Sequence, residues 1–159
     1  MPSNGEKAYE LHQAAIGQTE GSGDWLEVTQ ERIDAFADVT EDHQFIHVDP
    51  EACAQHSPWG VPIAHGFLTL SLLTALVGSV PLDVRQAEGR LLGINYGFDR
   101  VRFLSPVKVG SRVRAAATVA SVALKDPATL QVTQSVTVEI EGESKPALAC
   151  EWITRHVYG

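Results

Sequence analysis

The sequence predicts an α+β fold in which one long central helix is wrapped by a curved antiparallel β-sheet. Residues 64–78 are apolar around nearly the whole circumference of a helix, so in a small protein other elements must cover them. Four long segments with strand character follow the helix, over residues 91–104, 111–124, 129–141 and 147–157. Short turns join these segments, and turns of that length connect antiparallel neighbours.

The chain has 159 residues and a mass of 17.2 kDa, which suits one domain. We expect this domain to span residues 9–159 and residues 1–8 to form a flexible N-terminus. Apolar residues make up 44% and charged residues 20% of the chain, as is usual for a globular protein. Cys53 and Cys150 lie far apart without a C-x-x-C, which excludes a disulfide scaffold and a cysteine-rich zinc site. This cysteine usage fits a reducing, cytoplasmic environment.

The formal net charge of −8 argues against non-specific nucleic-acid binding. No signal peptide opens the chain, and polar residues interrupt its most apolar stretch, 63–80, so no membrane segment is predicted. Residues 85–114 nevertheless hold seven basic and two acidic side chains. This local excess predicts either a small anionic ligand or a set of solvated strand faces, and the composition alone does not separate the two.

Before the first clear helix we expect a helical turn over about 9–15 and a short hairpin formed by 16–18 and 25–28, with the turn GSGD between its strands. The helix itself is predicted over about 30–39. Thr29 is a suitable N-cap, and the spacing of Ile33, Phe36 and Ala37 gives one apolar face.

Residues 40–62 read as a loop that contains one short helix over about 50–55, because Asp49 and Pro50 suit the N-cap and first helical positions. The apolar helix over 64–78 follows, and Gly78 is a natural stop.

The third predicted strand has the clearest pattern, since apolar and polar residues alternate along it. Its inward face is predicted to hold Leu130, Val132, Val136, Val138 and Ile140. One face of the sheet is therefore buried and the other is solvated. A sheet wrapped around one helix leaves edge strands exposed, and pairing of two copies would cover them, so we expect a homodimer.

Two groups in the predicted loop after residue 40 can do acid–base chemistry. Asp42 and His47 lie five positions apart, where a carboxylate and an imidazole can share one water molecule and move its proton. On this spacing alone, a capping aspartate and a surface histidine are the favoured interpretation of the pair. Further along, Gly66 lies at the predicted start of the apolar helix, where its backbone N–H could polarise a carbonyl group. The alternative role for this glycine is close packing of the helix against the sheet.

Three segments carry a resemblance to a known family: EDHQFIHVDP, then GVPIAHGFLTLSLLT, and later FDRVRFLSPVKVGSRVRA. In this order they resemble the MaoC-like dehydratase family, which includes the R-specific enoyl-coenzyme A hydratases, and are most similar to its NodN-like branch. The resemblance spans about residues 25–155. It implies a hot-dog fold, usually dimeric, and the reversible syn addition of water to a trans-2-enoyl thioester, which gives an (R)-3-hydroxyacyl thioester. It also implies no metal or redox cofactor, with coenzyme A entering only as part of the substrate.

The resemblance assigns roles to individual residues. Asp42 and His47 match the acid and the histidine of the hydratase motif at the same spacing. Gly66 matches the glycine whose N–H holds the thioester oxygen, and Thr74 falls where relatives carry a hydroxyl behind the catalytic aspartate. His65 is expected to fix the loop or to contact the pantetheine of the substrate.

The motif also departs from the family pattern. Glu41 replaces its glycine, Gln44 its asparagine and Phe45 its proline. Gln44 keeps an amide that can bind water or the thioester, one methylene further out.

Two other functions stay open. A hot-dog thioesterase would carry a carboxylate on the central helix, and residues 67–77 contain neither Asp nor Glu. An acyl-thioester-binding protein, or a partner subunit of a heterodimeric dehydratase, would not need both Asp42 and His47. A metal site built from Asp42, His43, His47 and His56 is not predicted, because no H-x-H or H-E-x-x-H spacing organises the ligands.

Other side chains are expected around the substrate. Trp59, Phe67 and Phe103 could line an acyl tunnel or pack in the core, and Tyr96 could face the site. The candidates for binding the phosphates of coenzyme A are Arg100, Arg102, Lys108 and Arg112.

Overall fold

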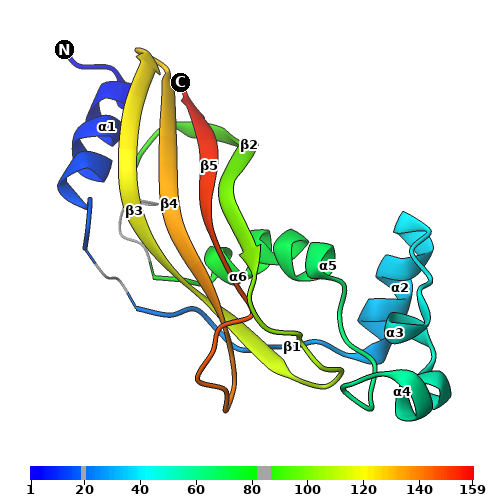
Figure 1. The fold of residues 1–159 in the computed structure, drawn as a ribbon. Coiled ribbons are helices and arrows are strands. Elements are labelled where there is room, and N and C mark those ends of the chain that lie inside the picture. The colour runs from blue at the N-terminus through cyan, green and yellow to red at the C-terminus, as the bar shows by residue number, and fades with distance from the viewer. Residues whose placement is uncertain (19–20, 82–86) are drawn as a thin grey trace.

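The computed structural model describes residues 1–18, 21–81 and 87–159 of the chain. A curved antiparallel sheet forms its body, two short consecutive helices lie against the sheet, and three further helices extend from one end (Figure 1). The α+β architecture predicted from the sequence is confirmed.

The sheet has five strands in the order β1-β3-β4-β5-β2, with every neighbouring pair antiparallel. Its strands are β1 (Leu26–Glu27), β2 (Arg90–Phe103), β3 (Arg112–Asp126), β4 (Thr129–Ile140) and β5 (Leu148–Tyr158). The last four agree with the predicted segments to within about two residues. The inward face of β4 is also confirmed, since all five of its predicted apolar residues are buried.

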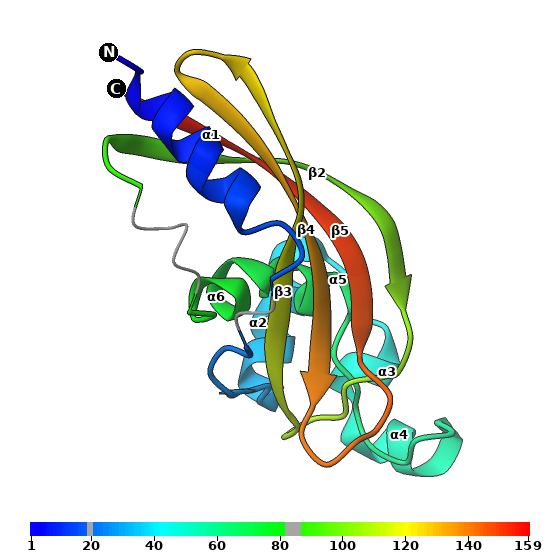
Figure 2. The ribbon, with the colours of Figure 1, turned by 90° about the vertical axis from the view of Figure 1, so that its left-hand side faces the viewer.

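The N-terminal region differs from the prediction. Helix α1 (Asn4–Ala14) begins where a flexible segment was expected, because Ser3 and Glu6 form a reciprocal capping box. The predicted hairpin is wrong: residues 16–18 form no strand, and β1 pairs with β3 instead. Figure 2 shows α1 lying across the end of the sheet where β3 and β4 meet.

Helices α2 (Gln30–Thr40), α3 (Phe45–Val48) and α4 (Pro50–His56) form the extension at one end of the sheet (Figure 1). As predicted, Thr29 caps α2 by accepting a hydrogen bond from the Arg32 N–H, and Asp49 caps α4 by accepting one from the Ala52 N–H.

The central helix is not continuous. It consists of α5 (Gly66–Ser71) and α6 (Leu73–Gly78), which meet at Leu72. It is also not buried all round: Leu68, Leu73 and Leu76 face the core, whereas Phe67 is 68% exposed. The sheet of one chain reaches only one side of the helix, which explains the difference. Gly78 is the last helical residue, and Ser79 is the C-cap.

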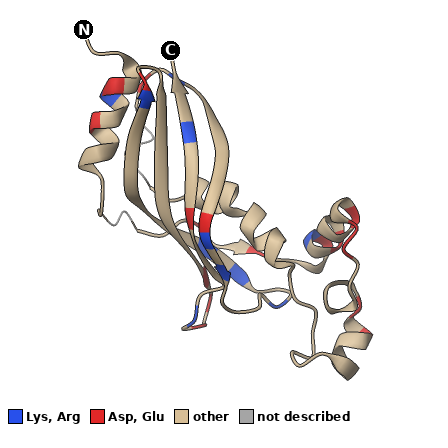
Figure 3. Ribbon diagram, turned by 45° about the horizontal axis from the view of Figure 1, so that its top comes forward, with Lys and Arg blue, Asp and Glu red and all other residues tan. Residues whose placement is uncertain are grey.

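Charges are distributed unevenly over this fold. Lys and Arg lie mainly on the strands and their connections, whereas α2–α4 carry mostly Asp and Glu (Figure 3). Two basic side chains of residues 85–114 pair with carboxylates from the neighbouring part of the chain: Arg114 with Glu139 on β4 (2.6 Å), and Arg112 with Glu141 just after β4 (3.0 Å). For these residues the solvated strand face is the better interpretation. In the described part of the chain, no helix combines the length and apolarity that a membrane crossing requires.

Candidate active site

The predicted acid–base pair lies where the chain turns out of α2. Glu41, the C-cap of this helix, adopts a left-handed conformation with φ 61°. This conformation favours glycine, the residue that the family motif carries at this position. The turn directs the chain into Asp42, whose carboxylate accepts a hydrogen bond from the Gln44 N–H at 3.4 Å. Asp42 itself is exposed to solvent.

Asp42, His47 and His65 come together at this turn. One carboxylate oxygen and one nitrogen from each ring lie within 4.8 Å of one another. The two histidines are buried, and their rings stack with centroids 3.8 Å apart and planes inclined by 23°. The structure thus brings together the predicted acid–base pair and adds a third group, His65, directly behind it.

The surroundings of His47 fix which ring nitrogen is available. Its Nδ1 lies 2.7 Å from the backbone oxygen of Ile63, an acceptor, so Nδ1 carries the proton and Nε2 is left as the basic atom. Burial lowers the pKa of His47 below its ordinary value; the Ile63 hydrogen bond opposes this shift, and His65 adds to it. Asp42 has a smaller, opposing effect on the same pKa. His47 is therefore neutral at neutral pH and can accept a proton.

His65 connects the two halves of the site. Its Nε2 donates a hydrogen bond to the backbone oxygen of Asp42 at 3.0 Å, and its ring stacks on His47. Phe36 closes the other side, with ring centroids 5.0 Å apart. Of the two roles expected for His65, the fixing of the loop is the one that these contacts support.

The same three residues are a candidate metal site by ligand type and spacing. The stack argues against this use, because the nitrogen lone pairs of two nearly parallel rings lie in parallel planes and do not converge on one ion. The Nε2 of His65 and the Nδ1 of His47 are in addition committed to backbone oxygens.

Gly66 begins α5, so its N–H has no acceptor within the helix, and no other described backbone oxygen accepts it. It borders a cavity of about 220 Å³, which Trp59 and Phe103 also line. A Cβ at position 66 would lie 3.0–3.2 Å from ring carbons of Phe103. The glycine therefore serves close packing and leaves a free N–H donor beside a cavity. Phe67, predicted with these aromatic residues, lies outside the cavity lining and meets Phe103 edge-on.

Two other predicted residues, Gln44 and Thr74, contribute no side-chain group to the cluster of Asp42, His47 and His65. Gln44 is exposed and is the N-cap of α3 without a side-chain capping bond. Thr74 lies on α6 and donates a 3.4 Å hydrogen bond to the Ser71 oxygen. It lines a different cavity, whose described lining includes neither Asp42 nor His47.

Sequence reasoning missed the backbone partners of His47. The Ile63 oxygen orients its ring, and the Gln30 amide donates to its backbone oxygen at 2.8 Å. Nothing in the sequence points to these contacts, because a backbone acceptor leaves no residue-type signal. His43, by contrast, is exposed and hydrogen-bonded to Asp38 at 2.8 Å, so it is not part of the cluster.

A family model and similar known proteins agree on one family for this chain. The model of the MaoC-like domain matches residues 12–141. Nodulation protein N of Rhizobium leguminosarum bv. viciae is 52% identical over 139 residues, which cover 87% of this chain and 84% of that protein. The 3-hydroxyacyl-thioester dehydratase Z of Mycobacterium tuberculosis H37Rv is 49% identical over 144 residues, covering 91% and 92% of the two chains.

Solved structures agree with the sequence matches. A monoamine oxidase regulatory protein from Archaeoglobus has a TM-score of 0.70 at 27% identity, with 91% of this chain and 92% of that one covered. The (R)-hydratase from A. caviae involved in PHA biosynthesis has a TM-score of 0.64 at 25% identity, with 87% and 98% covered. The hot-dog fold that the resemblance implied is confirmed by these neighbours.

Proposed function

Since the chain belongs to the MaoC-like dehydratase family, we propose that it catalyses the reversible addition of water to a trans-2-enoyl thioester, giving the (R)-3-hydroxyacyl thioester. The observation that supports this most is the convergence of Asp42 and His47, with His47 held as the Nδ1–H tautomer. We further propose coenzyme A as the carrier of the acyl group. The addition of water to an alkene is redox-neutral, so it requires no redox cofactor, and we propose that no metal takes part.

In this proposal His47 is the base. Its Nε2 accepts a proton from a water molecule that the Asp42 carboxylate orients, and the water oxygen bonds to the β-carbon of the alkene. The lowered pKa of His47 favours the neutral ring that this step needs. His65 is a positioning residue, since it fixes the Asp42 backbone and the plane of the His47 ring without facing the reacting atoms.

The β-carbon is electrophilic only if electron density can move to the thioester oxygen. We assign the stabilisation of that charge to the Gly66 N–H, which has no backbone acceptor among the described residues and borders a cavity. The proton held on His47 then returns to the α-carbon. Because one cluster delivers the hydroxyl group and the proton, both add to the same face of the alkene.

The test uses crotonyl-coenzyme A and measures conjugated-enoyl absorbance together with free thiol. Hydration removes the absorbance without releasing thiol, hydrolysis of the thioester releases thiol, and a binding protein does neither. We expect Asp42→Asn and His47→Asn each to lower the rate by about 10²–10⁴-fold. The matched controls are Asp38→Asn and His43→Asn, an exposed acid–imidazole pair from the same region, which should leave the rate unchanged. Full activity in both site variants would refute the assignment.

We also propose a homodimer joined along β2. This strand is an edge of the sheet, 14 residues long, and it exposes Leu91, Leu92 and Ile94 together with Tyr96. A long apolar edge of this kind invites pairing with another chain. Sedimentation equilibrium should give twice the monomer mass, and Leu92→Lys should lower it toward that of the monomer. A wild-type protein that stays monomeric at micromolar concentration would contradict the proposal.

A further inference from the structure

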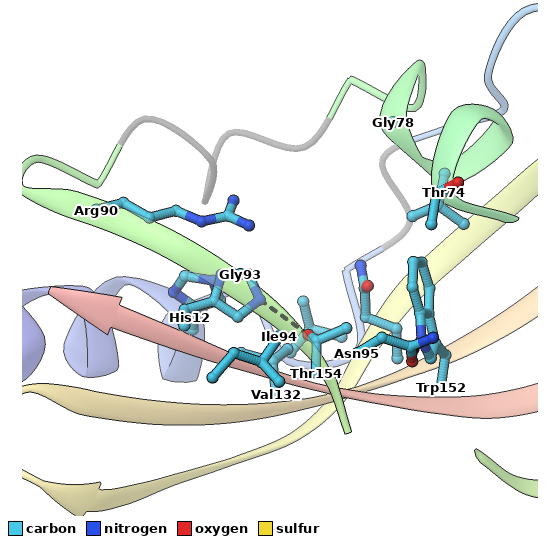
Figure 4. A pocket seen from close by; sticks show the side chains of 14 residues that line it. His12, Thr74, Gly78, Arg90, Gly93, Ile94, Asn95, Val132, Trp152 and Thr154 are labelled. Carbon is cyan, nitrogen blue, oxygen red and sulfur yellow. Dashed lines mark hydrogen bonds between the residues drawn. The ribbon is translucent and has the colours of Figure 1, made fainter. Parts of the chain in front are cut away.

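A cavity of about 410 Å³ is not used by the proposed chemistry. It lies between α6, the N-terminal half of β2 and the inner face of the sheet (Figure 4). Val119, Val132 and Trp152 supply apolar walls from three different strands. Its size is typical of a small-molecule site.

One inward position of β4 breaks the apolar pattern inside this cavity. Residues 130, 132, 136, 138 and 140 are buried and apolar, but the inward residue between Val132 and Val136 is Gln134. Only 8% of Gln134 is exposed, and no described residue hydrogen-bonds to its side-chain amide, so the polar atoms of this amide open to the cavity. A polar ligand that enters the cavity can take the place of water on this amide.

Neighbouring strands add further polar groups. Asn95 accepts a hydrogen bond from Trp152 Nε1 at 2.8 Å, which leaves the NH₂ of the Asn95 amide as a donor. Thr154, opposite both Asn95 and Val132 in the strand register, is bonded to the His156 ring at 2.8 Å. The inner face of the sheet therefore carries several polar groups along this part of its length.

A positive charge lies at one end of the cavity. In Figure 4 the Arg90 side chain extends over one end, with His12 below it, while Thr74 and Trp152 mark the other end. The described residues include no carboxylate in the cavity lining and none in an ion pair with Arg90. His12 donates through Nδ1 to the Ala8 oxygen at 2.8 Å, and burial lowers its pKa, so Arg90 is the cation of this lining.

We propose that this cavity receives the acyl chain of the substrate and that the chain ends in a carboxylate held by Arg90. A guanidinium without a partner and an unpaired amide are poor surroundings for a plain hydrocarbon chain, because both would lose water without gaining a hydrogen bond. A carboxylate would satisfy the guanidinium with two parallel hydrogen bonds. The apolar walls between the two ends suit the intervening methylene groups.

This inference rests on the proposed function and its homodimer, which also explain how the cavity meets the catalytic groups. The Phe103 end of β2 lies beside Gly66, and the Arg90 end lines the cavity. When two copies of β2 pair antiparallel about a two-fold axis, the Phe103 end of one strand adjoins the Arg90 half of the other. A thioester held at Gly66 in one subunit can then extend its acyl chain into the cavity of the second.

The test compares two saturated thioesters of equal chain length, hexanoyl-coenzyme A and adipoyl-coenzyme A, by calorimetric titration of the full chain. We expect adipoyl-coenzyme A to bind roughly 10–100-fold more tightly, the range for a hydrogen-bonded charge. Arg90→Met should abolish this preference and leave hexanoyl binding within about twofold, and Arg90→Lys should keep part of it. Gln134→Leu should favour hexanoyl-coenzyme A. Arg32→Met, an exposed arginine on α2, is the control and should change neither affinity.

Equal affinity for the two thioesters in the wild-type protein, or a preference that survives Arg90→Met, would overturn the inference. Neither titration depends on catalysis. If crotonyl-coenzyme A is hydrated but the carboxylate gives no advantage, the proposed function stands and the inference fails. If adipoyl-coenzyme A is preferred but no enoyl thioester is hydrated, the cavity assignment stands and the proposed reaction fails.

Discussion

Gly66 has two roles in this structure, and a pair of substitutions can separate them. The added methyl group of Gly66→Ala would lie 3.0–3.2 Å from ring carbons of Phe103. Overpacking of this kind costs about 1–3 kcal/mol, and we expect the lower end because the ring is half-exposed and can tilt. Replacing glycine in a helix recovers about 0.5–1 kcal/mol through the unfolded state. The free energy of unfolding should therefore change by less than about 1 kcal/mol.

Activity should respond far more strongly. The methyl group enters the space beside the N–H where the thioester oxygen has to approach, and loss of one such donor costs about 10²–10³-fold in kcat. KM should change little, because the charge on that oxygen develops in the transition state.

Thermal unfolding and the crotonyl-coenzyme A assay, applied to Gly66→Ala, Phe103→Ala and the double variant, test this reasoning. Phe103→Ala should relieve the crowding and restore stability in the double variant, while kcat stays low. Recovery of both properties would show that Gly66 serves packing alone. Full activity of Gly66→Ala would refute the role of its N–H altogether.

Three further predictions concern the same region. Glu41→Gly should raise the free energy of unfolding by about 0.5–1 kcal/mol. A side chain in the left-handed region costs about 1–2 kcal/mol, and the greater conformational entropy of glycine in the unfolded chain offsets part of the gain from removing it. A fall in Tm would contradict this prediction. As pH is lowered, kcat/KM for hydration should fall with a midpoint below pH 6.5. Burial lowers the pKa of His47, so the neutral ring is lost only as pH falls through that lowered value. A midpoint above pH 6.5 would exclude a neutral His47 as the base. Incubation with a chelator should leave the hydration rate unchanged; inactivation reversed by Zn²⁺ would instead assign a metal to Asp42, His47 and His65.

The sequence was most informative where one periodicity persists over a whole element. The four long strands span 11–15 residues each, and β4 alternates along its whole length, so the positions of the strands, and the face that β4 buries, could be predicted closely. The caps Thr29 and Asp49 were equally readable, since each acts within three residues of itself.

Elements that depend on distant partners were predicted less well. The apolar run over 64–78 predicts a buried helix, but burial on all sides requires more surface than one chain's sheet supplies, and Phe67 lies on the uncovered side. At the other end, the capping box of Ser3 and Glu6 is a local pattern that starts α1, but the bond that ties this helix to the sheet is not local. The Ser3 hydroxyl donates to the Pro127 oxygen, 124 residues away, while β1 pairs with β3 rather than with a neighbouring segment.

The acid–base pair shows the same division. The motif identified Asp42 and His47, but their geometry comes from His65 and from the Ile63 backbone oxygen, contributed by a segment about twenty residues further along the chain. A short motif can specify which groups react. Their tautomer and orientation depend on which later segment of the chain the fold places against them.

Gln134 shows where local pattern and function diverge. The alternation of β4 continues through this position, so the backbone turns it inward as it does Val132 and Val136, but the side chain is polar. Stability alone would favour an apolar residue there, because taking an amide from water into a largely apolar interior costs free energy unless hydrogen bonds compensate it. Sites that break the pattern of their own strand are therefore the positions at which a ligand has most to supply. In this chain Gln134 lines the same cavity as Arg90, which has no ion pair among the described residues. A polar residue on the inner face and an arginine without a carboxylate partner are independent observations. Both favour a polar ligand in this cavity.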